Sequence, residues 1–232
     1  YFRIRHGDGS SHIVMDAPPE HEDCRPFLKT ARLFGAAGAH VPEIFAQNLE
    51  EGFLLLSDLG DTTYLSALTA DNAAHLYADA LGALAAIQKA SVPDVLPEYS
   101  REVLLREVEL FPVWYVGRHK GATLSDAETA ALYEVFDRII EVNLAEPRVF
   151  VHRDYHSRNL MRTADRNPGV LDFQDALYGP LTYDLVSLFK DAYVSWDEEL
   201  TLDWLVRYWE AARKLGLPVR TDFAEFHRDY EF

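Results

Sequence analysis

The sequence predicts an α+β fold, with a small β-rich N-terminal lobe followed by a larger, mostly helical C-terminal lobe. Two observations predict it. Residues 1–57 alternate short β-prone runs with turn signals. Beyond residue 61 the apolar residues recur at helical spacing, interrupted by short β-prone runs between 148 and 175. We therefore place the N-terminal lobe at 1–57, a hinge at 58–61 and the C-terminal lobe at 62–232.

The N-terminal lobe is expected to contain four strands and one helix. Strands over 1–6 and 12–15 flank Gly7-Asp8-Gly9-Ser10, whose residue types predict a hairpin turn. A helix is expected over about 20–36, with Pro26 in its first turn or at a break. The other two strands are expected over 43–48 and 53–57.

Helices dominate the predicted C-terminal lobe. Leu76, Ala80, Leu84 and Ile87 share one face of a helix over about 71–90. The motif Ser125-Asp126-Ala127-Glu128 is a capping box at the start of a later helix. The other helices are expected over 101–115, 125–142, 183–194 and 198–215, and from 222 onward.

Composition narrows the functional class. The formal charge of −16 argues against binding to nucleic acid or to an anionic membrane, which would need a basic patch. The charge is compatible with a cationic small substrate without demanding one. No apolar run approaches the roughly 20 residues that span a bilayer, so no membrane segment is expected. Cys24 is the only cysteine, which excludes an internal disulfide and favours a cytoplasmic location.

Both ends of the chain look cut. Tyr1 begins without an initiator Met inside a strand pattern, and Phe232 ends inside a helical pattern. We therefore expect the N-terminal lobe to start after a lost upstream strand and the C-terminal lobe to be truncated.

The most informative pattern lies between the C-terminal helices. His152-Arg153-Asp154 is followed by Asn159, and then by Asp172 in an apolar context. Transfer of a γ-phosphoryl group requires a carboxylate that orients and deprotonates the attacking hydroxyl, and oxygen ligands that hold Mg²⁺ against the nucleotide phosphates. Asp154 is a candidate for the first role, and Asn159 and Asp172 for the second. Flanking β-prone runs over 148–151, 160–161 and 169–171 are expected to deliver these residues at strand ends.

The tetrapeptide His152-Arg153-Asp154-Tyr155 occurs again at 227–230. The second copy has no Asn at the same offset and no apolar-Asp strand after it, and it lies in a helical pattern. We expect it to be a surface or capping cluster. The spacing to Asn159 and Asp172, rather than the triplet, therefore indicates the phosphoryl-transfer site.

With these motifs, the chain resembles the aminoglycoside phosphotransferase and choline kinase branch of the protein-kinase-like fold. Within that branch it looks closest to the bacterial N-acetylmuramate/N-acetylglucosamine anomeric sugar kinases. The resemblance covers most of the chain. Its sharpest parts are 151–161, 167–175, Tyr178-Gly179-Pro180 and Tyr183-Asp184-Leu185, with Met15-Asp16-Ala17-Pro18-Pro19 adding a match in the first lobe.

The resemblance implies roles for further residues. Ser57, Asp58 and Leu59 lie where such kinases run the hinge whose backbone binds the adenine of ATP. Asp184 resembles a structural anchor of the catalytic loop. Three residues are implied near the sugar: His156, Arg158 and Asp175.

Two of these implied roles stay open. Arg158 suits a lactyl carboxylate, because a guanidinium binds carboxylates through paired hydrogen bonds, but it could equally pair with Asp154 or with a Glu side chain. Asp175 either binds substrate or organises the metal loop.

The chain departs from the family pattern at two points. A strand Lys normally contacts the α- and β-phosphates, and the register of Ile13-Val14-Met15-Asp16 predicts Asp16 at that place. An anionic side chain cannot neutralise phosphate, so another cation is required. The candidates in the first lobe are Arg3, Arg5, Arg25 and Lys29. The second departure is the absent phosphate-covering loop, which is expected upstream of Tyr1.

The predicted function is ATP- and Mg²⁺-dependent phosphorylation of the anomeric hydroxyl of N-acetylmuramate and N-acetylglucosamine, in cell-wall sugar recycling. The expected partner is a small sugar, with no nucleic acid and no membrane, and the sequence does not determine the oligomeric state. One alternative is a kinase for an aminoglycoside or another small alcohol, favoured by the acidic charge. Another is a nucleotide-binding pseudokinase, favoured by Asp16.

Overall fold

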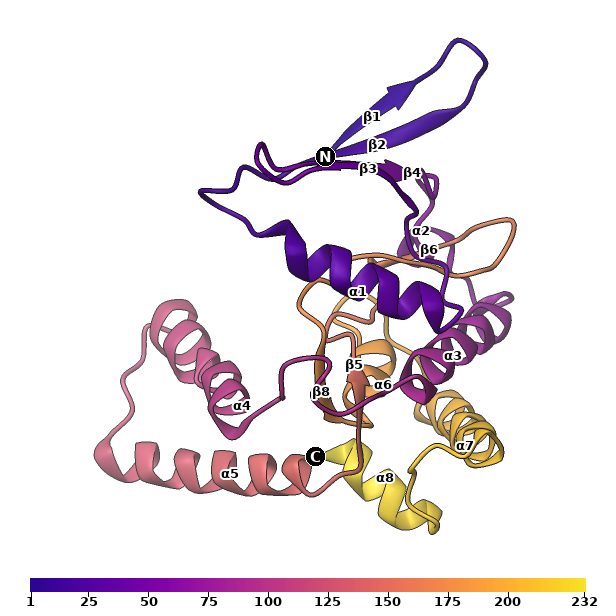
Figure 1. Ribbon diagram of the computed structural model, residues 1–232. Coiled ribbons are helices and arrows are strands. Elements are labelled where there is room, and N and C mark those ends of the chain that lie inside the picture. Colours follow the sequence, from indigo (N-terminus) through magenta and orange to yellow (C-terminus); the bar gives the residue numbers. More distant parts are fainter.

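The computed structural model describes all residues from Tyr1 to Phe232, with a β-sheet above a larger helical region (Figure 1). The sheet contains β1 (Phe2–Arg5), β2 (Ser11–Asp16), β3 (Ile44–Asn48) and β4 (Phe53–Ser57). All pairs are antiparallel and the strand order is β1-β2-β4-β3. The four strands and the β1–β2 hairpin predicted from the sequence are confirmed.

The helix of the first lobe, α1 (Cys24–Ala36), lies under the sheet (Figure 1). It begins later than predicted because the Asp23 side chain caps it, accepting a hydrogen bond of 3.0 Å from the Arg25 N–H. Pro26 falls in its first turn, where a missing N–H removes no helical bond. Phe27 and Phe34 are buried, and both rings pack against the ring of Phe173 in the helical lobe.

The helical region begins with α2 (Tyr64–Ala67) and α3 (Ala73–Lys89). An arm follows, which consists of α4 (Arg101–Val108), a π-helix η1 (Phe111–His119) and α5 (Asp126–Leu144). The helix predicted over 101–115 is wrong beyond Val108. Pro112 has no N–H and its ring collides with the carbonyl one turn earlier, so the α-helix ends and a π-helical segment follows. The capping box at Ser125 is confirmed.

The chain ends with α6 (Tyr183–Phe189), α7 (Glu198–Leu215) and α8 (Phe223–Glu231). The predicted helix over 183–194 is shorter than expected, because Asp191 accepts backbone hydrogen bonds from Ser157 and Tyr193 and so holds a loop there. α7 packs along α3 and stops at Gly216, which adopts a left-handed φ of 77°.

Two small antiparallel pairs hold the polar segment between the helices. β5 (Arg148–Val151) pairs with β8 (Leu177–Pro180), and β6 (Leu160–Met161) pairs with β7 (Gly169–Val170). β8 and the short α2 were not predicted. Residues 152–159 therefore run from the end of β5 to the start of β6, and Asp172 follows β7 closely. We name residues 152–159 the catalytic loop after the role predicted for Asp154.

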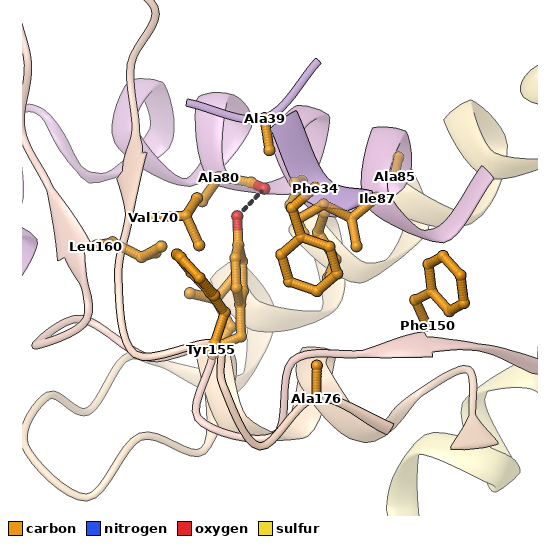
Figure 2. Close-up of a cluster of buried hydrophobic side chains, with 14 of the residues drawn as sticks. Phe34, Ala39, Ala80, Ala85, Ile87, Phe150, Tyr155, Leu160, Val170 and Ala176 are labelled. Atoms are coloured by element: carbon orange, nitrogen blue, oxygen red, sulfur yellow. Dashed lines mark hydrogen bonds between the residues drawn. The ribbon is translucent and has the colours of Figure 1, made fainter. Parts of the chain in front are cut away.

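One hydrophobic core supports both lobes. Figure 2 shows Phe34 of α1 beside Ala80 and Ile87 of α3, with Phe150 of β5 and Tyr155 of the loop packed against them. Tyr155 is fully buried and donates a hydrogen bond of 2.8 Å to the Ala80 carbonyl. This packing anchors the catalytic loop from below. None of the helices combines the length and the apolar character that crossing a bilayer requires.

Candidate functional site

A cleft of about 400 Å³ separates the sheet from the polar segment. Its upper wall carries Ile13 of β2 and Leu56 of β4, and its lower wall carries Met161 and Leu171. Five of the residues singled out in the sequence line this one cleft: Ser57, Asp58, Leu59, Asn159 and Asp172. Apolar walls with a few polar groups suit a ligand that has a flat ring and a charged tail.

The side chains of Ser57 and Asp58 hold the hinge in place. Ser57 Oγ accepts a hydrogen bond of 2.8 Å from the Glu43 N–H. Asp58 accepts hydrogen bonds from Ser11 and Arg3. Burial raises the pKa of Asp58, but these hydrogen bonds outweigh it and leave the pKa below its ordinary value. The backbone N–H and C=O of Asp58 and Leu59 make no hydrogen bond within the protein, so they are free for a ligand.

The catalytic loop is held by two buried side chains. Asp184 of α6 accepts hydrogen bonds from the backbone N–H groups of His152 (2.7 Å) and Arg153 (3.0 Å). His152 Nε2 donates to the Leu171 carbonyl at 2.9 Å, and burial lowers its pKa to about 4, so the ring is neutral. Arg153 adopts a left-handed φ of 80°, which these contacts enforce. Asp184 and His152 therefore support the loop, and for Asp184 this agrees with the anchoring role that the family resemblance implied.

Asn159 joins the loop to Asp172. Its Nδ2 donates to the Asp154 carbonyl at 3.0 Å and to Asp172 Oδ2 at 3.1 Å. Asp172 Oδ1 accepts a hydrogen bond from Gln174, and the residue has a left-handed φ of 64°. The donor set consists of carboxylate and amide oxygens, which suit Mg²⁺ because that ion takes one or two carboxylates together with substrate phosphates.

Asp154 stands exposed at the end of this cluster. Burial on one side and the negative charge of Asp172 raise the pKa of its carboxyl group, whereas His156 and Arg153 oppose the shift and Asp175 adds to it. The four predicted residues Asp154, Asp172, Asp175 and His156 thus lie close enough to affect one titration. A carboxylate with a raised pKa is a better proton acceptor, which is what a general base needs.

Arg158 lies between Asp154 and Asn159 in the loop and points to solvent. It forms no ion pair with Asp154 or with any Glu, so that alternative is wrong. Its guanidinium instead donates a hydrogen bond of 3.1 Å to the Tyr193 hydroxyl.

Glu107 of α4 supports the loop and was missed in the sequence. It accepts hydrogen bonds from Arg153 and from the hydroxyls of Tyr99 and Tyr183. Glu107 lies 46 residues before Arg153, so no local pattern could reveal the pair. The one hint in the sequence was Arg153 itself, because an arginine in a partly buried loop needs a carboxylate partner.

The predicted place of Asp16 is wrong. Side chains alternate along a strand, and Ile13 lines the cleft while Met15 is buried on the same face. Asp16 is exposed on the opposite face, because it is an odd number of residues from both. The cleft-facing register position is therefore apolar Met15.

Three of the four candidate cations of the first lobe are engaged by other groups. Arg3 pairs with Asp58, Arg25 pairs with Asp23, and Lys29 donates to the Val95 carbonyl. No Lys or Arg is among the residues that line the cleft.

The second tetrapeptide, at 227–230, is helical as expected but is not a surface cluster. Asp229 and Tyr230 are buried, because they share the inner face of α8 with Phe226. Asp229 pairs with Arg220 at 2.7 Å.

The chain matches known proteins over almost its whole length. The sequence pattern of the phosphotransferase enzyme family matches residues 1–226. An N-acetylmuramate/N-acetylglucosamine kinase of Pseudomonas putida is 53% identical over 228 residues, covering 98% of this chain and 67% of the relative. A kinase of the same name from Neisseria meningitidis is 48% identical over 236 residues, covering 100% of this chain and 70% of the relative.

Solved structures share the fold at lower identity. An aminoglycoside phosphotransferase from Streptomyces rimosus in complex with ADP and streptomycin gives a TM-score of 0.64 at 14% identity, covering 98% of this chain and 87% of that one. An ADP-bound aminoglycoside phosphotransferase gives 0.61 at 16% identity, covering 99% and 90%. The two-lobed α+β architecture is therefore that of the protein-kinase-like phosphotransferases.

Proposed function

The chain belongs to the phosphotransferase enzyme family, and from that premise we propose that this small-molecule kinase transfers the γ-phosphoryl group of ATP to the anomeric hydroxyl of N-acetylmuramate and N-acetylglucosamine. The observation that carries the proposal is the cleft itself. Residues from the hinge and residues beside the candidate base line its two ends, although they are about a hundred positions apart in the sequence.

The nucleotide is proposed to bind with its adenine against the hinge. The free backbone groups of Asp58 and Leu59 supply a donor and an acceptor for the ring edge. Ile13, Leu56 and Leu171 supply apolar surface for its two faces. This direction points the phosphates toward Asn159 and Asp172.

Those two residues are proposed to hold Mg²⁺. The ion would neutralise charge on the β- and γ-phosphates during transfer, which matters here because the cleft lining has no Lys or Arg. The hydrogen bond from Asn159 orients the Asp172 carboxylate toward that end of the cleft.

Asp154 is proposed to be the base. It accepts the proton of the sugar hydroxyl as the oxygen attacks the γ-phosphorus in line with the leaving ADP oxygen. Asp184 binds the backbone of the loop and Glu107 binds the Arg153 side chain, and both contacts hold the Asp154 carboxylate in place before the substrate binds.

Product analysis tests the proposed reaction. The protein is incubated with Mg²⁺ and ATP labelled on the γ-phosphate, and with each sugar in turn. A sugar 1-phosphate is expected, recognised by phosphorus NMR and by its hydrolysis in mild acid. The matched control is the methyl glycoside of each sugar, which keeps the ring and every other hydroxyl but has a methyl group in place of the anomeric proton. Phosphorylation of the methyl glycoside would contradict transfer to the anomeric hydroxyl.

The alternatives are separated in the same assay. An aminoglycoside kinase would phosphorylate a kanamycin-type substrate in preference to either amino sugar. A pseudokinase would form no product with any member of the panel, although the feature that favoured it, Asp16, faces away from the cleft.

A further inference from the structure

Arg158 has surroundings unlike those of the other arginine in the catalytic loop. Arg153 is half-buried and paired with Glu107. Arg158 is exposed and has no carboxylate within ion-pair distance, in a chain with 38 acidic residues. In the sequence it lies between the candidate base Asp154 and the candidate metal ligand Asn159, so an unneutralised guanidinium belongs to the same loop as both.

Tyr193 holds that guanidinium in one orientation. Arg158 Nη1 donates a hydrogen bond of 3.1 Å to the Tyr193 hydroxyl, and the guanidinium carbon lies 5.0 Å from the centre of the tyrosine ring. Stacking on a ring fixes the plane of the guanidinium, and the single hydrogen bond leaves its other N–H groups free. Arg158 is thus pre-organised for a planar anion.

A second contact ties Tyr193 to the catalytic loop. Asp191 Oδ1 accepts from the Tyr193 N–H at 3.0 Å, and Asp191 Oδ2 accepts from the Ser157 N–H at 3.0 Å. The ring of His156 also meets the Tyr193 ring edge to face, with centroids 5.8 Å apart. These contacts tie Arg158 and Tyr193 to the loop that carries Asp154, so an anion bound there has a defined place relative to the base.

The two sugars of the proposed function differ by one charged group. N-acetylmuramate carries a lactyl ether on C3 that ends in a carboxylate, whereas N-acetylglucosamine has a hydroxyl there. We infer that Arg158, backed by Tyr193, binds the lactyl carboxylate and sets the preference of the enzyme for the acidic sugar. Planar recognition of a carboxylate by paired N–H groups is the task to which arginine is suited. The inference rests on the proposed function.

Steady-state kinetics with both sugars test it. The quantity to measure is kcat/KM for N-acetylmuramate divided by kcat/KM for N-acetylglucosamine. In Arg158→Gln this ratio is expected to fall roughly tenfold to a hundredfold, because a charge-assisted bidentate pair is lost, and the loss should lie in the KM for N-acetylmuramate. Arg158→Lys should give an intermediate ratio, since lysine keeps the positive charge but lacks the paired N–H groups of the guanidinium. Tyr193→Phe should lower the ratio a few-fold, because stacking remains while the hydrogen bond is lost.

The matched control is Arg162→Gln. Arg162 is an exposed arginine of the same segment and makes no ion pair, so its variant should keep the wild-type ratio. An equal fall for both sugars in Arg158→Gln would overturn the inference, since it would assign Arg158 to the nucleotide or to loop structure. An unchanged ratio would overturn it as well. A wild-type protein that phosphorylates neither sugar would instead overturn the proposed function, a result distinct from both.

Discussion

The two copies of His-Arg-Asp-Tyr place identical side chains in opposite settings. In the first copy Asp154 is exposed at the end of a cleft, whereas in the second Asp229 is buried against Arg220. His152 is fully buried, whereas the side chain of His227 is 41% exposed. The Tyr155 hydroxyl donates to Ala80, whereas the buried Tyr230 hydroxyl has no partner.

The backbone accounts for the difference. Arg153 has a left-handed φ of 80° in a loop, which turns its neighbours His152 and Asp154 in different directions. The second copy is helical, so its residues follow a fixed rotation, and those on the inner face are buried whatever their polarity. The tetrapeptide can therefore form a reactive site only where the surrounding chain fixes the orientation of its four side chains.

The largest contrast is expected between the two aspartates. Asp154→Asn should lower kcat by roughly 10²–10⁴-fold, because the carbonyl oxygen of an amide is a far weaker proton acceptor than a carboxylate. Asp229→Asn should instead lower the free energy of unfolding by about 2–4 kcal/mol, because it breaks a buried ion pair with Arg220. Kinetics and urea unfolding of both variants check this. Loss of stability in the first variant with full turnover would reverse the assignment.

Two buried carboxyl groups, one beside each copy, should make stability depend on pH. Burial raises the pKa of Asp184 to about 7 and the pKa of Glu146 to about 8, above the values of 3.8 and 4.5 for free groups. At a pH between the unfolded and the folded pKa of each group, the carboxyl group is ionised in the unfolded chain but still protonated in the folded protein. These two groups therefore lower the unfolding free energy as pH rises from about 4 to about 8, by an amount on the order of a few kcal/mol. His152, whose pKa burial lowers from 6.5 to about 4, acts in the opposite direction between those two values.

Urea titrations across that range measure the effect. Glu146→Gln should flatten the upper part of the curve and Asp184→Asn the lower part, because each removes one titrating group. Variants whose unfolding free energy changes with pH in the same way as that of the wild type would contradict both assignments.

A smaller effect is expected when the two arginines, Arg153 and Arg228, are compared. This comparison tests whether Glu107 of α4 positions the loop through Arg153. Glu107→Gln removes the carboxylate that holds Arg153, so kcat should fall roughly tenfold to a hundredfold through misalignment of the loop. Arg228→Gln, at the matching place in the second copy, should change unfolding by no more than about 0.5 kcal/mol, because Arg228 is exposed and unpaired. Equal kinetics for Glu107→Gln and wild type would show that Glu107 does not position the base.

The tyrosines give the smallest expected effect. Tyr155→Phe should lower unfolding free energy by about 1 kcal/mol, since the Ala80 carbonyl loses its side-chain donor. Tyr230→Phe should be neutral or slightly stabilising, because its buried hydroxyl has no partner to lose. Thermal unfolding of the two variants separates them, and the opposite order would disagree with the hydrogen-bond assignment.

Much of the architecture was predictable because it depends on local order. Turn residues marked the hairpin at 7–10, apolar spacing marked α3, and Ser125 with Glu128 marked the start of α5. These signals act within a few residues, where propensity and periodicity apply. The spacing of Asp154, Asn159 and Asp172 was readable for the same reason, because strand–loop–strand geometry is short-range.

Tertiary structure alone decided which faces and which distant partners these residues have. Asp16 and Asp229 lie on faces that the fold, not their neighbours, turns outward or inward. Arg153 meets Glu107 across 46 positions, and Arg158 meets Tyr193 across 35. A chain with 38 carboxylates offers many partners for each arginine, and packing of the whole core selects one or none. The sequence alone thus determined the chemistry available at the site, and the packed structure determined the geometry in which that chemistry is held.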